Sequence, residues 1–353
     1  MNARLSRRAT LGGLAALAAA PALGQGFAGL GQAAQGFAEV RRDRPLRFPA
    51  DHGPHPDFRI EWWYVTANLR GDDGAAYGVQ WTLFRQALAP DDRGAGWDSA
   101  QLWMGHAAAT SAAVHRAEER FARGGVGQAG VTGDPFAAWI DDWALTGDRD
   151  LKAARLRAAG RGFAYDLALS ADGPLVLHGD NGFSLKSERG QASHYYSQPH
   201  YGAQGTLTLD GRAIAVTGEG WMDREWSTQP LDPDQTGWDW FSLRLDSGEK
   251  VMLYRFRQSA GADAFAGTWI DAAGRAQPLA QGDVTMAPLS FASVAGRETP
   301  VRWRLEVASR GFAVETAPLN PQSWNPLTVA YWEGPVTGEG THRATGYLEM
   351  TGY

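Results

Sequence analysis

The residues best suited to acid–base chemistry are concentrated between residues 220 and 240. This segment holds Asp223, Glu225 and Asp239, together with one arginine, Arg224. It also holds four indoles: Trp221, Trp226, Trp238 and Trp240. Carboxylates packed against indole faces lose solvation, which raises their pKa and lets them stay protonated near neutral pH. The segment therefore predicts a general acid, Asp223 or Glu225, beside indoles able to contact a ligand.

If residues 223–226 form a β-strand, their side chains point alternately to its two faces. In a strand, Asp223 and Glu225 lie on one face, and Arg224 and Trp226 lie on the other. A structural interpretation of the same residues is a set of interdomain salt bridges between the carboxylates and arginines, with the indoles as barrel core. The sequence leaves both interpretations open.

Other clusters offer weaker candidates. Tyr195 and Tyr196, between a histidine and a serine, are either ligand contacts or barrel wall. Glu61 beside Trp62-Trp63, and Glu333 after an aromatic pair, are either buried acids or charges at a barrel rim. The run Asp-His-Gly-Pro-His at residues 51–55 has enough donors to begin a metal site. No partner cluster is visible, so we expect a structural loop there and no metal.

Two tryptophan-rich hairpins indicate that the chain uses one unit twice. The first runs through residues 61–69 and 79–86, and the second through 237–245 and 251–258. Trp62 corresponds to Trp238. Each copy closes on Thr-Gly-x-x-x-Met, at residues 217–222 and 345–350. This correspondence places the junction between the units at about residues 224–236.

Composition and periodicity predict an all-β protein. The 353 residues include 44 glycines and 15 tryptophans, and short alternating runs recur along the chain. Further strands are expected at residues 163–169, 175–177, 205–209, 213–217, 301–307 and 311–316. Helical periodicity is confined to the leader and to residues 112–123 and 148–158. We expect two closed or nearly closed antiparallel barrels, because closure removes exposed edges.

The N-terminus predicts export. Ser6-Arg7-Arg8 precedes an apolar stretch and a small-residue cleavage site ending at Gly24, which is typical of a twin-arginine leader. We expect a signal peptide at residues 1–24, a linker at 25–47, and a periplasmic or secreted mature chain. The leader is too short to span a bilayer, so no transmembrane segment is expected in the mature chain.

Charge and cysteine content exclude several classes of protein. The formal net charge is −6, and removal of Arg4, Arg7 and Arg8 with the leader lowers it to −9. This net negative charge disfavours nucleic acid and anionic membranes as partners. The chain has no cysteine, which excludes disulfides, iron–sulfur clusters and a thiol nucleophile.

Six motifs occur in order along the chain: Asp-His-Gly-Pro-His-Pro at 51–56, Glu-Trp-Trp-Tyr-Val at 61–65, Tyr-Tyr-Ser-Gln-Pro at 195–199, Trp-Met-Asp-Arg-Glu-Trp-Ser at 221–227, Gly-Trp-Asp-Trp-Phe at 237–241 and the terminal Thr-Gly-Tyr. Together they resemble the AttH and carotenoid 1,2-hydratase family, often described as predicted secreted hydrolases. The resemblance extends from about residue 48 to residue 353. It implies two tandem lipocalin-like domains, which we place at residues 48–228 and 229–353, with little helix.

The resemblance also implies a hydrophobic ligand held in or between the barrels. In the hydratase branch an acid protonates an isoprenoid alkene and water captures the cation, with no cofactor. Carried over to this chain, the site comprises Asp223, Glu225, Trp226 and Tyr254. Arg224 stands where relatives have a histidine, and Phe256 stands where the hydratases have an acid.

These observations lead to two functional hypotheses. The first is a hydratase or hydrolase without a cofactor, acting on an isoprenoid or lipid, with Asp223, Glu225 and Tyr254 as catalytic residues. The expected ligand contacts are Trp62, Tyr195, Tyr196, Trp221, Trp226, Trp238, Asp239 and Trp240. The alternative is a periplasmic lipid carrier without catalysis. The sequence identifies no protein partner.

Overall fold

The computed structural model describes residues 35–90, 96–229 and 231–353. Within these ranges the chain forms two antiparallel β-sheets, which confirms the all-β prediction. The helical elements among the described residues are short 3-10 turns: η2 (Ala50–His52), η3 (Gly96–Asp98), η4 (Gln281–Asp283) and η5 (Ala308–Arg310). In this part of the chain, no helix has the length and apolar character needed to cross a membrane.

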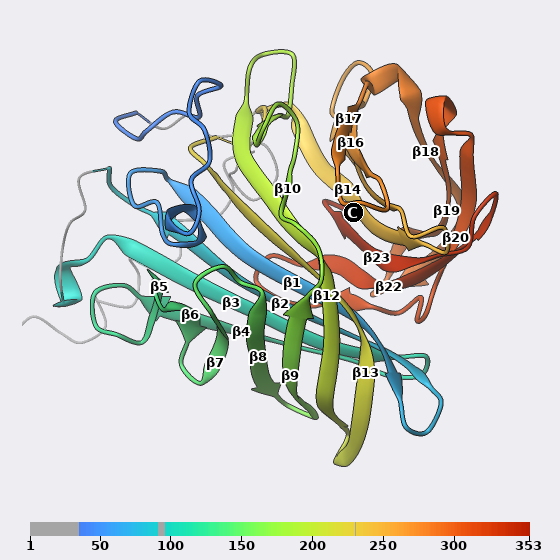
Figure 1. The fold of residues 1–353 in the computed structure, drawn as a ribbon, viewed down its shortest axis with the longest axis horizontal. Coiled ribbons are helices and arrows are strands. Elements are labelled where there is room, and N and C mark those ends of the chain that lie inside the picture. Colours follow the sequence, from blue (N-terminus) through green and yellow to red (C-terminus); the bar gives the residue numbers. More distant parts are fainter. Residues whose placement is uncertain (1–34, 91–95, 230) are drawn as a thin grey trace, which may run out of the picture.

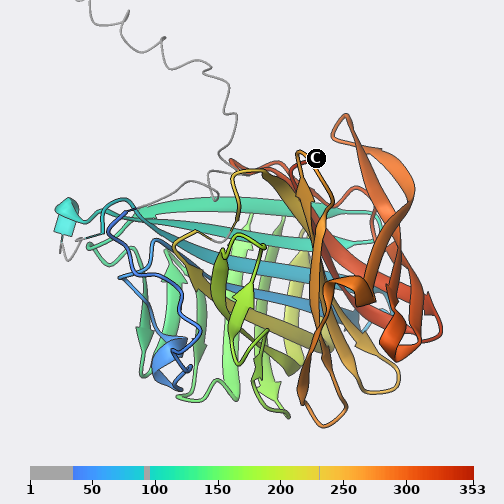
Figure 2. The same cartoon turned by 90° about the horizontal axis from the view of Figure 1, so that it is seen from above.

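The first sheet curls into a nearly closed barrel (Figures 1 and 2). Its continuous path is, in spatial order, β4 (His115–Arg123), β3 (Gln101–Ser111), β2 (Ala76–Ala87), β1 (Ile60–Gly71), β13 (Arg212–Ser227), β12 (Ala192–Leu209), β9 (Phe163–Ala171), β8 (Ala153–Gly160), β7 (Trp143–Gly147), β6 (Phe136–Ile140) and β5 (Ala129–Gly133). Two short strands, β10 (Val176–Leu177) and β11 (Phe183–Leu185), pair with the beginning of β12.

The second sheet forms a half-barrel beside the first (Figure 1). Its path is β17 (Ala276–Leu279), β16 (Ala264–Ile270), β15 (Lys250–Gln258), β14 (Gln235–Leu245), β23 (Ala344–Thr351), β22 (Tyr331–Gly340), β20 (Phe312–Pro318), β19 (Arg297–Val307) and β18 (Val284–Val294), with β21 (Trp324–Asn325) paired to β22. Together the two sheets match tandem lipocalin-like barrels, as expected.

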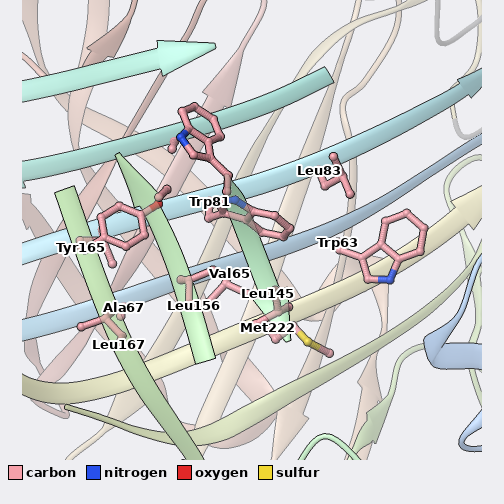
Figure 3. Packing of buried hydrophobic residues seen from close by; sticks show 14 of the residues in the cluster. Trp63, Val65, Ala67, Trp81, Leu83, Leu145, Leu156, Tyr165, Leu167 and Met222 are labelled. Carbon is pink, nitrogen blue, oxygen red and sulfur yellow. The ribbon is translucent and has the colours of Figure 1, made fainter. Parts of the chain in front are cut away.

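Side chains fill the interior of the first barrel (Figure 3). Trp63 and Val65 of β1 point inward, where they join Trp81, Leu156 and Tyr165. Burial of a large apolar side chain contributes about 1.5–3 kcal/mol. The alternate residues of the same strand, Trp62 and Tyr64, belong instead to a cluster shared with the second sheet.

The helical expectation for residues 112–123 and 148–158 is wrong. The first segment contains β4, and the second overlaps β8 from residue 153 onwards. In β8, Leu156 and Ala158 are buried while Arg155 and Arg157 are exposed. This period-two burial on a sheet outweighs the helical propensity of an alanine- and arginine-rich sequence.

Strand register identifies equivalent positions in the two halves. Tyr64 pairs with Asp223 across β1 and β13, and Trp240 pairs with Glu349 across β14 and β23. Glu349 is therefore the counterpart of Asp223. The Thr-Gly-x-x-x-Met motifs align Asp223 with Thr351 instead, so that alignment is two residues out of register.

The connection between the sheets runs from Ser227 to Gln235, and the expected domain boundary falls within it. Of the expected linker, residues 35–47 are described, and they lie along the first domain. The Ala38 amide donates to the Asp57 carbonyl, and Arg42 pairs with Asp180 at 2.6 Å. The expected leader lies outside the described residues.

Candidate active site

A cavity of about 210 Å³ lies between the two sheets. The outward faces of the two tryptophan hairpins form opposite walls, with Trp62 and Tyr64 on one side and Trp238 and Trp240 on the other. The rings of Tyr64 and Trp240 meet edge to face, with centroids 5.5 Å apart. The repeated Trp-x-aromatic pattern thus supplies both halves of one aromatic cavity.

The side chains that line the cavity differ in their access to solvent. Gln86 is exposed, and Trp62, Met104 and Trp238 are partly exposed. Lys186, Tyr195, Asp223, Glu225 and Tyr254 are nearly inaccessible. Several polar groups of the cavity are therefore largely shielded from solvent.

Asp223 is the carboxyl group best prepared to act as an acid. It accepts hydrogen bonds from Tyr195 Oη at 2.8 Å, from Trp221 Nε1 at 2.7 Å and from Ser197 Oγ. Burial raises the pKa of Asp223 to about 7, although these three donors stabilise the carboxylate and oppose the increase. The group can therefore hold or release a proton near neutral pH.

Glu225 faces the same cavity in a different electrostatic environment. It pairs with Lys186 at 2.9 Å, and both side chains are buried. Burial lowers the pKa of Lys186, but the charge of Glu225 outweighs this effect and raises it overall. The Lys186 ammonium also lies 4.8 Å from the ring centroids of Tyr195 and Tyr254. The ion pair makes Glu225 a weaker candidate for the acid than Asp223.

Glu349 is the third carboxyl group that lines the cavity. It is partly exposed and accepts a hydrogen bond from Trp238 Nε1 at 2.5 Å. Burial raises the pKa of Glu349 to about 7, against the stabilising effect of Trp238 on the carboxylate. The negative charges of Asp223 and Glu225 also raise the pKa of Glu349 by repulsion, so Asp223 can be protonated while Glu349 is ionised.

A further acid, Glu333, is buried behind the cavity wall. Glu333 accepts a hydrogen bond from Tyr64 Oη at 2.5 Å, and burial raises its pKa well above the ordinary value. Tyr331, the neighbour of Glu333 in the structure, bonds His106 Nδ1 at 3.1 Å. Burial lowers the pKa of His106 to about 3, so its imidazole is neutral at physiological pH.

The opposite face of β13 carries a structural ion network. Arg224 pairs with Glu61, which also pairs with Arg85, and the Arg224 guanidinium lies 3.8 Å from the Trp63 ring centroid. Burial raises the pKa of Glu61, but the two arginines outweigh it and hold that pKa well below its ordinary value. Arg224 therefore points away from the cavity, and its occurrence in place of a histidine does not alter the cavity lining.

The Asp-His-Gly-Pro-His run, expected to form a structural loop, belongs to the same network. His55 lies 3.0 Å from Asp51 and 3.3 Å from Glu61, and its ring stacks on Trp226 at 3.9 Å. Asp51 also pairs with Arg44 at 2.7 Å. These contacts account for the Asp-His-Gly-Pro-His run as a structural loop that closes one end of the first domain.

The structure brings most of the expected site residues together. Seven of them line the cavity: Trp62, Tyr195, Asp223, Glu225, Trp238, Trp240 and Tyr254. Trp221 contacts Asp223 from behind.

Three expected ligand contacts lie elsewhere. Tyr196 bonds His52 Nδ1 at 2.7 Å, Trp226 stacks on His55, and Asp239 pairs with Arg255 and Arg257. Each occupies the strand face opposite to that of its cavity-lining neighbours, because successive side chains alternate.

Sequence reasoning missed Lys186, His106 and Glu349 as cavity residues. Lys186 and His106 have no local motif, since the fold brings them to the cavity from distant segments. Glu349 could have been found by aligning the two copies in strand register, in which it corresponds to Asp223.

Comparison with known proteins is consistent with this architecture. A crystal structure of an AttH protein from Nitrosomonas europaea has 33% sequence identity and a TM-score of 0.82, covering 90% of this chain and 99% of that chain. Kievitone hydratase from Nectria haematococca has 15% identity and a TM-score of 0.66, covering 89% of this chain and 95% of that one. CghA in complex with Sch210972 has 12% identity and a TM-score of 0.51, with coverage of 83% and 88%. The last two likenesses show the fold alone.

The fold and the cavity define a tandem lipocalin-like β-protein with carboxyl groups buried in an aromatic interdomain cavity. The AttH-like family model matches residues 39–353, so the chain belongs to the AttH-like family. No curated protein matches the sequence.

Proposed function

We propose that this protein adds water to a carbon–carbon double bond of an apolar isoprenoid or lipid held in the interdomain cavity. The observation that carries the proposal is the Asp223 carboxyl, which faces an aromatic cavity and has a pKa raised by burial to about 7. The hydratase among the structural neighbours supports the same class of reaction.

Asp223 is the general acid in this mechanism. Its proton passes to one alkene carbon, and the adjacent carbon becomes a carbocation. The faces of Trp62, Tyr64 and Trp240 surround the cavity and stabilise positive charge through their negative π faces. The Tyr195 hydroxyl, held by Trp240 Nε1 at 3.3 Å, positions the acid.

Glu349 is the base. Water attacks the cation and loses its extra proton to the Glu349 carboxylate, which can be ionised at neutral pH because its pKa is about 7. The net change is addition of one water molecule, with no oxidant or cofactor. Glu349 is partly exposed whereas Asp223 is buried, so Glu349 can release the proton to solvent.

The experiment is incubation of the mature protein in oxygen-18 water with acyclic isoprenoids and with a cell-lipid extract, followed by mass analysis. Asp223→Asn should lower turnover by about 10²–10⁴-fold while retaining the ligand, as expected for loss of a general acid. Glu298→Gln, at an exposed position on the second sheet, is the control and should leave turnover unchanged.

Two results would contradict the proposal. Full activity in Asp223→Asn would exclude this residue as the acid. An unaltered lipid that co-purifies with both the parent and Asp223→Asn would indicate a carrier. We further propose export to the periplasm or beyond, which rests on the twin-arginine pattern at Ser6-Arg7-Arg8.

A further inference from the structure

A second cavity of about 850 Å³ lies beside the first, and Tyr254 contributes to the walls of both. Its rim carries exposed side chains, namely Arg42, Asp180, Leu185 and Arg275, so water can enter it. Its buried end is lined by His178 and Thr268, each about 1% exposed. The proposed reaction does not use this cavity for its ligand.

A continuous chain of hydrogen bonds joins the second cavity to Asp223. Thr268 Oγ1 lies 2.8 Å from His178 Nδ1, and His178 Nε2 lies 2.6 Å from Ser197 Oγ. Ser197 Oγ in turn donates to Asp223 Oδ1. The other oxygen, Oδ2, accepts from Tyr195 on the side of the first cavity. The two carboxylate oxygens of Asp223 are therefore engaged from different sides.

This series of hydrogen bonds also links the two sheets. Thr268 belongs to β16 of the second sheet, while Ser197 and Asp223 belong to β12 and β13 of the first. The His178 ring packs on Tyr195, with centroids 4.1 Å apart. Its position is thus set by packing as well as by hydrogen bonds at both nitrogens.

His178 has the chemistry of a relay rather than of a charged acid. Burial lowers its pKa to about 3, and the nearby Lys186 ammonium acts in the same direction. A neutral imidazole carries one N–H and one lone pair, so it can accept a proton at one nitrogen while releasing one from the other. Serine and threonine hydroxyls can likewise donate and accept at the same time.

The proposed hydration creates a need for such a relay. Each turnover leaves the buried Asp223 ionised and the partly exposed Glu349 protonated. A ligand in the first cavity covers Asp223 on that side and shields it from solvent. The missing proton must then reach Asp223 from another side.

We propose that Thr268, His178 and Ser197 form a proton relay that reloads Asp223 from the second cavity. Ser197 gives its hydroxyl proton to Asp223 Oδ1 and receives one from His178 Nε2. His178 Nδ1 receives a proton from Thr268, which takes one from water in the second cavity. For each proton that enters from the second cavity, one reaches Asp223, so Thr268, His178 and Ser197 are all neutral after the transfer. This inference rests on the proposed function, in which Asp223 is the acid.

Transfer along this chain reverses every hydrogen bond in it. When Asp223 is ionised, Ser197 donates to it and His178 carries its proton on Nε2. When Asp223 is protonated at Oδ1, it donates to Ser197, Ser197 donates to Nε2, and His178 carries its proton on Nδ1. The tautomer of His178 therefore reports the protonation state of Asp223.

The test is nitrogen-15 NMR of protein labelled at histidine, because protonated and unprotonated ring nitrogens have well-separated shifts. His178→Gln identifies the His178 signals among those of the eight histidines. Titration across the pKa of Asp223 should move the His178 proton from Nδ1 to Nε2 as pH rises, while the ring stays neutral. In Asp223→Asn the tautomer should not change with pH. A single tautomer at all pH values in the parent protein would overturn the proposal.

Other charged groups near the chain must be separated from this response. Those that act electrostatically on Asp223, His178 or both are Glu225, Lys186 and Glu349. Glu349→Gln removes the other group that titrates near pH 7, and the tautomer change should persist in this variant. Its disappearance would assign the response to Glu349 and contradict the relay.

Turnover supplies an independent measurement. Thr268→Val cuts the outer end of the chain without touching Asp223, whereas Thr268→Ser keeps the hydroxyl. Thr268→Val should leave the first turnover intact and slow the later ones by about 10²-fold, the lower end of acid–base contributions. Thr268→Ser should retain the parent rate. Equal loss in the first and later turnovers would indicate a structural role only.

The two measurements separate the two proposals. A tautomer change without any water addition would support the relay as a physical connection and contradict the hydratase function. Water addition without a tautomer change would support the hydratase function and overturn the relay.

Discussion

Trp221 controls the acidity of Asp223, and its replacement by phenylalanine gives the sharpest test of the electrostatic argument. The Trp221 indole donates to Asp223 Oδ1 at 2.7 Å from a fully buried position. A hydrogen bond to a charged group contributes about 1.5–3 kcal/mol. Since one pKa unit corresponds to about 1.36 kcal/mol, Trp221→Phe should raise the pKa of Asp223 by about one to two units from its value of about 7.

The same strand offers a matched control. Trp226 is also a fully buried indole of β13, but within the described residues its Nε1 has no hydrogen-bond partner. Trp226→Phe removes similar volume and should leave the pKa of Asp223 unchanged. Both variants should lose stability to a similar degree through packing.

The assay is infrared difference spectroscopy of the carboxyl band as a function of pH, with Asp223→Asn to identify the Asp223 signal. The high-pH limb of the activity profile should move upward together with the pKa in Trp221→Phe. An unchanged or lowered pKa in this variant, or an equal shift in both variants, would refute the assignment of Trp221 as a specific donor to the acid.

Three further predictions concern the surroundings of the site. Lys186→Met leaves Glu225 as an unpaired buried charge and should cost about 3–5 kcal/mol in urea unfolding, and the additional change Glu225→Gln should restore most of it. Burial raises the pKa of Glu349 from 4.5 to about 7, so its contribution to stability is present below about pH 4.5 and lost as pH rises through about 7. Glu349→Gln should therefore gain stability relative to the parent across this interval, and a constant difference would contradict the shift. Gly78→Val places side-chain atoms against Pro335 and Tyr347 of the second sheet, so it should push the sheets apart and weaken ligand retention, whereas the exposed Gly211→Asn should not.

Much of the fold could be predicted from local pattern. The tryptophan hairpins, the strands near residues 163 and 301, and the turn at Asp210-Gly211 follow from alternation and turn chemistry, and the structure contains them all. The strands at 112–123 and 148–158 could not be predicted in this way. Their short polar sequences favour a helix locally, and only pairing with neighbouring strands in the sheet overrides that preference.

The candidate site was likewise predictable only in part. The face shared by Asp223 and Glu225 was predictable, since it depends only on the period of a strand. The roles of Tyr196, Trp226 and Asp239 were not, because the sequence does not say which face of each strand meets the other domain. In both hairpins that face is the one carrying Trp-x-aromatic, whose outward side chains pack against each other.

The sequence by itself determined the all-β class, the duplication and the alternation that puts two carboxyl groups on one side of β13, because these depend on neighbours within a few residues. Only the tertiary structure decided that the aromatic cavity lies between the sheets and that Lys186 pairs with Glu225, while no ion pair to Asp223 is found among the described residues. It also decided that His178 joins Asp223 to a second cavity. Solvation and pKa depend on which distant groups surround a carboxyl in three dimensions, and no local spacing encodes that.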